Sequence, residues 1–274
     1  PERVLPGQAL EEIVNNPKIV GGFDEKSSDL ASTLFRAINR SQILVTDCAT
    51  AEVVKLSENT FRDVNIAYAN ELALICEDLG VDVMQVIKLA NTHPRVNIHI
   101  PGCGVGGPCL PKDPYLLLHQ YVSKGSTSKI VEPARRLNDY MAKHTANLVM
   151  EALRQVCKDI TDAKIAVLGV SYKSDVGDAQ NSPSEIIIRE LKEQGADVWV
   201  YDPYCEEVFT AQRAKNIEEA VRDADCLVVA TDYKIFKHLD LQTIGKLMRD
   251  QPIIVEGKRV FGPDNALNNK FKYY

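Results

Sequence analysis

A cysteine at the end of a glycine-rich stretch is the first residue whose type and setting suggest chemistry. The stretch PGCGVGGPCLPKD spans residues 101–113 and carries Cys109, with Lys112 three residues later. Glycines let the backbone approach a ligand closely, and a helix that began at Pro111 would direct its positive end towards the thiol. That helix end and Lys112 both favour the thiolate, which is the nucleophilic form. A lone cysteine is more often an inert apolar residue, so the residues alone leave both interpretations open.

Three polar residues follow one another along a predicted long helix. Lys55, Asn59 and Arg62 are four and three residues apart, so a helix places them on one face. Most of their neighbours are apolar, which predicts that much of this helix is buried. The stripe fits a cleft for an oxygen-rich, anionic ligand, and it fits a solvent-exposed helix face equally well.

A second set of polar residues follows the predicted strands of the C-terminal half. These are the GVSYK turn at residues 169–173, Asp202, and the basic pair Lys258 and Arg259. Doubly wound sheets bind ligands at the carboxyl ends of their strands, so the lysines and the arginine would bind a diphosphate and Asp202 a ribose. The first turn lacks the G-x-G-x-x-G fingerprint, which argues against an ordinary dinucleotide site. Solvated loop charges are the simpler alternative.

Two different kinds of pattern position these residues. Residues 45–157 are mostly helical, with a run free of Pro and Gly at 50–79, a helix at 83–91 and an amphipathic helix at 132–157. From residue 158 apolar strands at 164–172, 197–202, 226–231 and 252–256 alternate with helices at 184–194 and 217–223. This alternation predicts an α/β fold with a Rossmann-like, doubly wound parallel sheet. We predict regions at 1–47, 48–157 and 158–274.

The composition argues against several functional classes. A chain that is 45% hydrophobic and 26% charged is typical of a globular protein, and a formal net charge of −6 argues against nucleic-acid binding. No apolar run approaches the roughly 20 residues of a membrane helix, and the start lacks a signal-peptide pattern, so we expect a cytoplasmic protein. The seven cysteines are scattered and form no C-x-x-C pair, so neither a disulfide framework nor a metal site is expected.

Four motifs in order resemble the UDP-glucose/GDP-mannose dehydrogenase family. They are AEVVKLSENTFRDVNIAYANELALIC, GVGGPCLPKD, GVSYKSDVGDAQNSPS and EGKRV, and together the resemblance covers essentially the whole chain. It implies NAD-dependent oxidation of the C6 alcohol of a nucleotide sugar to a carboxylate. It also implies a helical central domain that forms a homodimer through its long helix, followed by a Rossmann-like domain that binds the UDP-sugar.

The resemblance implies the catalytic roles position by position. Cys109 falls on the nucleophile, which traps the aldehyde as a thiohemiacetal and carries it on to a thioester. Lys55 falls on the residue that handles the proton of the alcohol or stabilises negative charge, Asn59 on the one that holds that oxygen, and Asp113 on the one that orients lysine or water. Glu2 matches the glutamate assigned to hydrolysis of the thioester.

The other matched positions imply contacts with substrate, cofactor or a second subunit. Those matched to sugar or phosphate contacts are Arg3, Val4, Arg62, His93, Arg95, Gly106, Tyr172, Lys173 and Arg259. Arg95 would act across the dimer interface, whereas His93 read alone is an ordinary loop histidine. At position 180 the family usually has an arginine that reaches the NAD phosphates, and Gln180 weakens that expectation here.

The resemblance also bears on the substrate and on the extent of the chain. PERVLPGQALEEI and LANTHPRVNI most resemble members that act on UDP-N-acetyl-D-mannosamine; the UDP-glucose enzymes have N-P-E-F-L-x-E-G at the first stretch, where this chain has Pro6 in place of a second glutamate. Residues 1–47 match the end of the family's N-terminal dinucleotide-binding domain, so we expect most of that domain to be absent from this chain. The chain alone is then expected to bind a UDP-sugar without turning it over. Two alternatives stay open: a dehydrogenase of UDP-glucose or another UDP-hexose, and a non-catalytic module that binds a UDP-sugar and dimerises.

Overall fold

The helices and strands group into two compact units in the computed structural model, which describes residues 3–4 and 7–274. The first unit is Pro1–Arg62 with Lys112–Val131, and the second is Asp63–Pro111 with Glu132–Tyr274. The long helix α3 (Cys48–Leu79) contributes residues to both units.

The first unit contains a short pair of parallel strands. Its elements are α1 (Ala9–Asn15), β1 (Lys18–Gly22), α2 (Glu25–Arg36), β2 (Ile43–Asp47) and α5 (Asp113–Ser123). β1 pairs with β2 in parallel, and α2 forms the crossover between them. Where β2 ends, the Asp47 carboxylate accepts the N–H of Thr50 at 2.9 Å, so the chain passes directly from the strand into α3.

Helices of the second unit begin and end at local signals in the sequence. α3 contains neither glycine nor proline, and Gly80 ends it with a φ of +66° in the left-handed region. α4 (Val83–Ala90) begins at Asp82, whose carboxylate accepts the N–H of Met84 at 2.9 Å. α6 (Val131–Gln155) is the second long helix.

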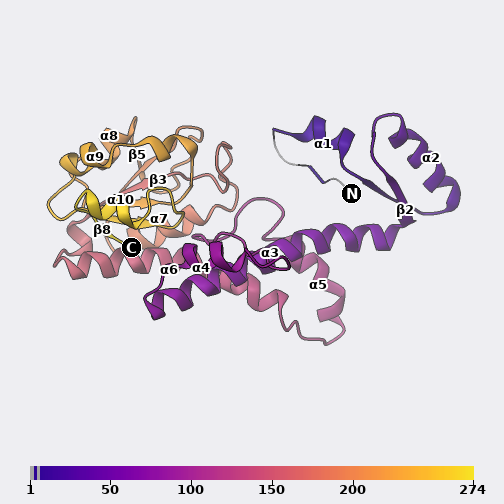
Figure 1. Ribbon diagram of the computed structural model, residues 1–274, viewed down its shortest axis with the longest axis horizontal. Coiled ribbons are helices and arrows are strands. Elements are labelled where there is room, and N and C mark those ends of the chain that lie inside the picture. The colour runs from indigo at the N-terminus through magenta and orange to yellow at the C-terminus, as the bar shows by residue number, and fades with distance from the viewer. Residues whose placement is uncertain (1–2, 5–6) are drawn as a thin grey trace. The chain divides into compact units, whose positions relative to one another are not determined.

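A parallel sheet forms the core of the second unit (Figure 1). Within the described residues its six strands are β3 (Lys164–Leu168), β4 (Asp197–Tyr201), β5 (Gln212–Arg213), β6 (Cys226–Val229), β7 (Ile253–Glu256) and β8 (Lys272–Tyr273). Their order is β5-β4-β3-β6-β7-β8, and every neighbouring pair is parallel. The order reverses between β3 and β6, which is where ligands bind in such sheets.

Helices cover both faces of this sheet. They are α6 and α7 (Pro183–Glu193) on one face, and α8 (Ile217–Val221), α9 (Leu241–Leu247) and α10 (Pro263–Asn268) on the other. The alternation of side chains along β3 serves both cores: Ile165 and Val167 pack with α6 and α7, whereas Ala166 and Leu168 pack with the other three helices. Two short 3₁₀ helices, Ile160–Asp162 and Lys234–His238, complete the described elements.

The predicted fold class is confirmed, and one helix start is corrected. The helices of residues 48–155 and the all-parallel sheet that follows are those expected from the change of pattern near residue 158. The helix predicted to begin at Pro111 begins instead at Asp113, because Pro114 takes the proline position of its first turn. Cys109 is therefore four residues from that helix along the chain rather than two. In the part of the chain that the structure describes, no helix is both long and apolar enough to cross a bilayer.

Candidate active site

The cysteine loop, residues 101–109, lies along the carboxyl edge of the parallel sheet. A Cβ added to Gly107 would be 2.7 Å from the Tyr172 ring, in the turn after β3. The Cys103 thiol donates to the carbonyl of Ala230, just past β6, at 3.3 Å, and a Cβ on Gly257, just past β7, would be 2.8 Å from the Cβ of Cys103. The loop therefore crosses the strand ends at which the sheet order reverses.

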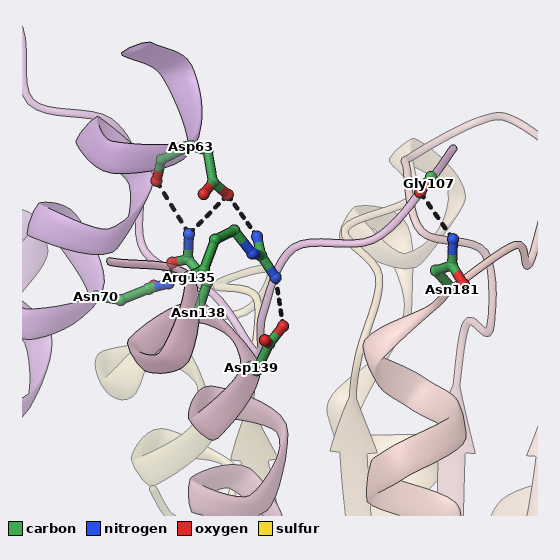
Figure 2. Close-up of polar contacts among 7 residues, drawn as sticks. All are labelled: Asp63, Asn70, Gly107, Arg135, Asn138, Asp139 and Asn181. Atoms are coloured by element: carbon green, nitrogen blue, oxygen red, sulfur yellow. Dashed lines mark hydrogen bonds and ion pairs between the residues drawn. The ribbon is translucent and has the colours of Figure 1, made fainter. Parts of the chain in front are cut away.

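Gly107 is held by the segment that precedes α7. Its N–H donates to the carbonyl of Gln180 at 2.9 Å, and its own carbonyl accepts from Nδ2 of Asn181 at 3.1 Å (Figure 2). Gly106 is buried, and a Cβ there would be 2.5 Å from the Asn181 carbonyl, so no larger residue fits without a backbone shift. The glycines of the motif are thus required by close packing of two backbones.

The two cysteines of the loop lie in opposite environments. Cys103 is 3% exposed, and burial raises the pKa of its thiol, which keeps it protonated. Cys109 is exposed. Burial also raises the pKa of the Tyr172 hydroxyl, and the nearby side chains of Asp178 and Cys109 raise it further. Cys109, beside a protonated tyrosine, is therefore the thiol that a solute can reach.

In the first unit, Lys55 lines a pocket of about 490 Å³. The pocket lies at the start of α3 and is bordered by Gly21, Cys48, Ala51, Glu52, Leu56 and Leu116. Lys55 is half-buried, and apart from Glu52 the residues that line the pocket with it are uncharged and mostly apolar. A lysine in such a setting suits proton transfer or stabilisation of an anion.

The next residues of the stripe differ in their environment. Asn59 and Asp113 are both buried, and Nδ2 of Asn59 donates to Oδ2 of Asp113 at 2.6 Å. Arg62 is exposed. The structure thus brings two predicted catalytic residues into direct contact at the packing of α3 against α5.

Arg3 lies against the same helix. Its guanidinium donates to both carboxylate oxygens of Glu58, at 3.1 and 2.8 Å, and also to the carbonyl of Pro17 at 3.0 Å. Val4 beside it is half-buried. Glu2, predicted to act in thioester hydrolysis, lies outside the described residues.

His93 and Arg95 lie in an exposed turn of the second unit. The Asn91 side chain closes this turn by donating to the carbonyl of Ile98 at 3.0 Å and accepting its N–H at 2.7 Å. The N–H of Arg95 donates to Nδ1 of His93 at 3.3 Å, and both side chains are exposed. They are available to a ligand or to a second subunit.

The two basic residues after β7 point to different neighbours. A Cβ on Gly102 would be 2.4 Å from Nζ of Lys258, so that lysine packs on the cysteine loop. Arg259 pairs with Asp82 at 2.6 Å. Their turn wraps around the Glu256 carboxylate, which accepts the N–H groups of residues 260, 261 and 262 and the hydroxyl of Tyr273. Of the basic pair that the sequence analysis proposed for a diphosphate, Lys258 is thus the residue in contact with the loop.

The remaining predicted residues lie in the turns around the loop. Lys173 is half-buried in the turn after β3. Gln180 is exposed, and its backbone carbonyl accepts the N–H of Gly107. Asp202 does not have the free carboxylate that a ribose would need. It accepts N–H groups of Val170, Ser171, Tyr204 and Cys205 and the hydroxyl of Tyr233, so it stabilises the turn internally. The sequence placed Asp202 at the end of a strand, but it could not predict that five hydrogen-bond donors surround its carboxylate.

A buried polar network was missed by the sequence analysis. Asp63, Asn70, Arg135 and Asn138 are each at most 1% exposed and are hydrogen bonded to one another across α3 and α6 (Figure 2). The only signal in the sequence was polar residues on otherwise apolar helix faces. Among residues 3–4 and 7–274, no group of three or more His, Cys, Asp or Glu side chains is arranged to hold a metal ion.

Two profiles of one protein family match the chain. The UDP-glucose/GDP-mannose dehydrogenase family, central domain, matches residues 49–140, and the UDP binding domain of the same family matches residues 166–263. Together these ranges cover more than half of the chain. The chain belongs to the UDP-glucose/GDP-mannose dehydrogenase family. The members of this family use NAD, and its UDP binding domain implies a UDP-sugar ligand.

Longer proteins of this dehydrogenase family match nearly all or all of the chain. UDP-N-acetyl-D-mannosamine dehydrogenase of Pyrococcus horikoshii is 45% identical over 260 residues, which are 95% of this chain and 60% of that protein. The solved structure of UDP-D-ManNAc dehydrogenase from Pyrococcus horikoshii matches this chain with a TM-score of 0.92 at 43% identity. The match covers 100% of this chain and 63% of that one. The solved structure of NDP-N-acetyl-D-galactosaminuronic acid dehydrogenase from Methanosarcina mazei matches with a TM-score of 0.92 at 35% identity. This match covers 100% of this chain and 60% of that one. The chain spans about 60% of the length of these relatives.

Proposed function

We propose that this chain is the substrate-binding portion of an NAD-dependent dehydrogenase that oxidises the C6 alcohol of UDP-N-acetyl-D-mannosamine to the carboxylate. The observation that carries the proposal is the contrast between exposed Cys109 and buried Cys103 within one glycine loop. An acyl-forming oxidation needs one accessible thiol held by rigid backbone, and a binding module needs none. The sugar is taken from the name of the Pyrococcus horikoshii relative, which is 45% identical to this chain.

The first oxidation uses residues of the α3 stripe. Lys55 receives the proton of the C6 hydroxyl or stabilises the alkoxide, and Asn59 holds that oxygen. Asp113 fixes the amide of Asn59 through the 2.6 Å hydrogen bond between them. NAD supplies the hydride acceptor at each of the two oxidations.

The second oxidation uses the cysteine loop. The Cys109 thiolate adds to the aldehyde carbon, and the carbonyl oxygen takes a proton, which gives a thiohemiacetal. Loss of a hydride from carbon and of the hydroxyl proton then gives a thioester. Water adds to the thioester carbonyl, the carbon–sulfur bond breaks, and the carboxylate leaves with the thiol restored; Glu2 assists this step.

Residues around these groups bind the nucleotide sugar. The remaining predicted contacts are Arg3, Val4, Arg62, His93, Arg95, Gly106, Tyr172, Lys173 and Arg259, with Arg95 acting on the neighbouring subunit's site. The cofactor fits the described part of this chain poorly. Gln180 offers an uncharged side chain where a phosphate contact is expected, and we assign no other residue of the chain to NAD.

The proposed enzyme is a homodimer that works in the cytoplasm and joins through α3. Phe61, Tyr68 and Ile75 recur every seven residues on this helix and are 67%, 54% and 49% exposed, with Leu79 69% exposed after them. A stripe of large apolar side chains with this period is typical of helix pairing between subunits.

The substrate is tested with the natural polypeptide that contains this sequence. NADH formation is followed with UDP-N-acetylmannosamine, UDP-N-acetylgalactosamine, UDP-N-acetylglucosamine and UDP-glucose. We expect UDP-N-acetylmannosamine to give the highest kcat/KM and two NADH per sugar. A preference for another UDP-sugar would replace the substrate but keep the chemistry.

The role of the thiol is tested by comparing Cys109→Ser with Cys103→Ser in the same polypeptide. C109S should form no carboxylate, and C103S should retain turnover because its thiol is buried. In the 274-residue chain, UDP-N-acetylmannosamine should protect Cys109 from iodoacetamide. Binding without protection, together with an active C109S enzyme, would favour the non-catalytic UDP-sugar-binding module.

A further inference from the structure

A line of buried polar side chains ends on the backbone of the cysteine loop. Nδ2 of Asn138 donates to Oδ1 of Asp63 at 2.9 Å and to its carbonyl at 3.0 Å (Figure 2). Nδ2 of Asn70 donates to Oδ1 of Asn138 at 2.9 Å. Oδ1 of Asn70 then accepts the N–H of Gly102 at 2.9 Å. Two amide side chains, those of Asn138 and Asn70, therefore connect the buried Asp63 carboxylate to the start of the loop.

The direction of these hydrogen bonds is set by the charge on Asp63. A carboxylate only accepts, so the amide of Asn138 must turn its NH₂ towards Asp63 and its oxygen towards Asn70. Asn70 must then donate to that oxygen, which leaves its own oxygen for the N–H of Gly102. Nη1 of Arg135 donates to the same Oδ1 of Asp63 at 2.5 Å. The two asparagine amides therefore have one orientation in which these hydrogen bonds all form. In that orientation the oxygen of Asn70 needs a hydrogen-bond donor from the loop, and the N–H of Gly102 supplies it.

Stability alone does not explain this network. Among the described residues, Oδ2 of Asp63 and Nε of Arg135 are buried and have no hydrogen-bond partner. A buried ion pair with unsatisfied atoms is often no more stable than apolar side chains of the same size. A role in fixing the loop accounts for its polarity.

The loop is held again at its other end. A Cβ on Gly104, whose φ is +130°, would be 3.1 Å from the backbone carbonyl of Asn138, so the loop also rests on α6. Gly107 is bonded on both its N–H and its carbonyl by residues 180 and 181. Between Gly102 and Gly107 the loop covers the thiol of Cys103, and Cys109 follows two residues after the second fixed point.

We propose that Asn70 and Asn138 are positioning residues, which hold the cysteine loop closed over Cys103 and thereby keep Cys109 in one place relative to the substrate. The catalytic half of this statement rests on the proposed function. The structural half does not, since it concerns only the loop and the helices beneath it.

The test compares Asn70→Ala and the milder Asn70→Ser with a matched control, Asn39→Ala. Asn39 is also buried, at 6%, and its side-chain oxygen also accepts a backbone N–H, that of Ser41 at 2.8 Å, but it lies in the first unit. Melting temperatures show whether each variant folds and how far it is destabilised. Iodoacetamide labelling, resolved by peptide mass spectrometry, gives the alkylation rates of Cys103 and Cys109 separately.

In the folded 274-residue chain, we expect N70A to raise the alkylation rate of Cys103 about tenfold or more, the factor for losing one buried hydrogen bond. N39A should leave that rate unchanged at equal loss of melting temperature. In the natural polypeptide, N70A should lower kcat roughly tenfold and change KM little, because the fault lies in placement of the nucleophile. N70S should fall between N70A and the unaltered protein in both measurements.

The outcomes separate this proposal from the proposed function. Unchanged labelling of Cys103 in N70A, or an unchanged kcat alongside faster labelling, overturns the positioning role. An unaltered enzyme that oxidises no UDP-sugar refutes the proposed function instead, and the labelling of Cys103 then still decides whether Asn70 holds the loop.

Discussion

Asn59 and Asp113 are 54 residues apart in sequence and share a 2.6 Å hydrogen bond in which the buried amide donates to the buried carboxylate. The bond fixes the start of α5 to the middle of α3. It also fixes the orientation of the amide, since a carboxylate cannot donate. The side-chain oxygen of Asn59 is therefore directed away from Asp113.

Replacing Asp113 with alanine should destabilise the fold by about 1–3 kcal/mol, the cost of leaving the buried Asn59 amide without its acceptor. Urea unfolding measures this. Asp264→Ala is the matched control, because Asp264 also lies in the first turn of a helix but is exposed. A loss no larger than that of D264A would mean that the hydrogen bond contributes little.

Glycine 107 should not tolerate alanine, for two separable reasons. Its φ of +89° costs an L residue about 1–2 kcal/mol, and a Cβ would also meet the Tyr172 ring at 2.7 Å. Gly125 has a φ of +83° with open space around it, so Gly125→Ala measures the backbone cost alone. We expect G107A to lower the melting temperature more than G125A does. When Tyr172 is also replaced by alanine, most of that difference should disappear. Equal losses of melting temperature in G107A and G125A would argue against a collision with the Tyr172 ring.

The Asp63–Arg135 pair should show opposite effects in single and double variants. Asp63→Leu alone leaves the buried Arg135 paired only with the exposed carboxylate of Asp139 among the described residues, which should cost up to about 3–5 kcal/mol, whereas D63L with Arg135→Met should be near neutral at pH 7. Urea unfolding of the four proteins in this double-mutant cycle measures the coupling. A double variant as unstable as D63L would show that the polar pair is itself required for stability.

The same pair predicts a pH dependence. Burial raises the pKa of Asp63 above its ordinary value of 3.8 despite Arg135, so the folded state keeps this proton to higher pH than the unfolded state does. The contribution of Asp63 to the free energy of unfolding is therefore fully present below pH 3.8 and falls as pH rises through the raised value. Measured from pH 4 to 7, the stability of wild type relative to D63L/R135M should decline and then level off; a difference that grows with pH would reverse the sign.

The exposed apolar residues of α3 should be required for dimerisation. Light scattering during size exclusion should show a dimer for the unaltered chain and a monomer for Ile75→Glu or Tyr68→Glu. Ile235→Glu is the control, since Ile235 is 44% exposed on a different helix. A monomeric parent chain, or a dimer that persists in both α3 variants, would exclude this surface.

Much of the fold followed from the sequence because its signals are local. The run from Cys48 to Leu79 contains no breaker, Gly80 ends it, and the strands of the sheet are short apolar segments between helical ones. The start of α5 was wrong by two residues, because two prolines, Pro111 and Pro114, offered competing first turns.

The candidate site was only partly accessible to the same reasoning. Helical spacing placed Lys55 and Asn59 on one face, but it could not reveal that Asp113 was the partner of Asn59. Arg259 was expected beside the substrate, and its carboxylate partner Asp82 lies 177 residues earlier. Asn70 lies within the long-helix motif but had no role assigned to it, and Asn138 lies in none of the four motifs. Such partners are fixed by packing between distant segments, and a periodic pattern reports only which face a residue occupies.

The carboxylate of Glu256 has a consequence for how the protein can be shortened. It holds three backbone N–H groups of the turn that presents Lys258 and Arg259, and the hydroxyl of Tyr273 in β8 occupies the same carboxylate. Trimming the chain before β8 would remove more than an edge strand, because the basic turn would lose one of the groups that fix its carboxylate. A shortened protein that ends before Tyr273 would therefore also alter the surroundings of the cysteine loop, because Lys258 of this turn packs on Gly102.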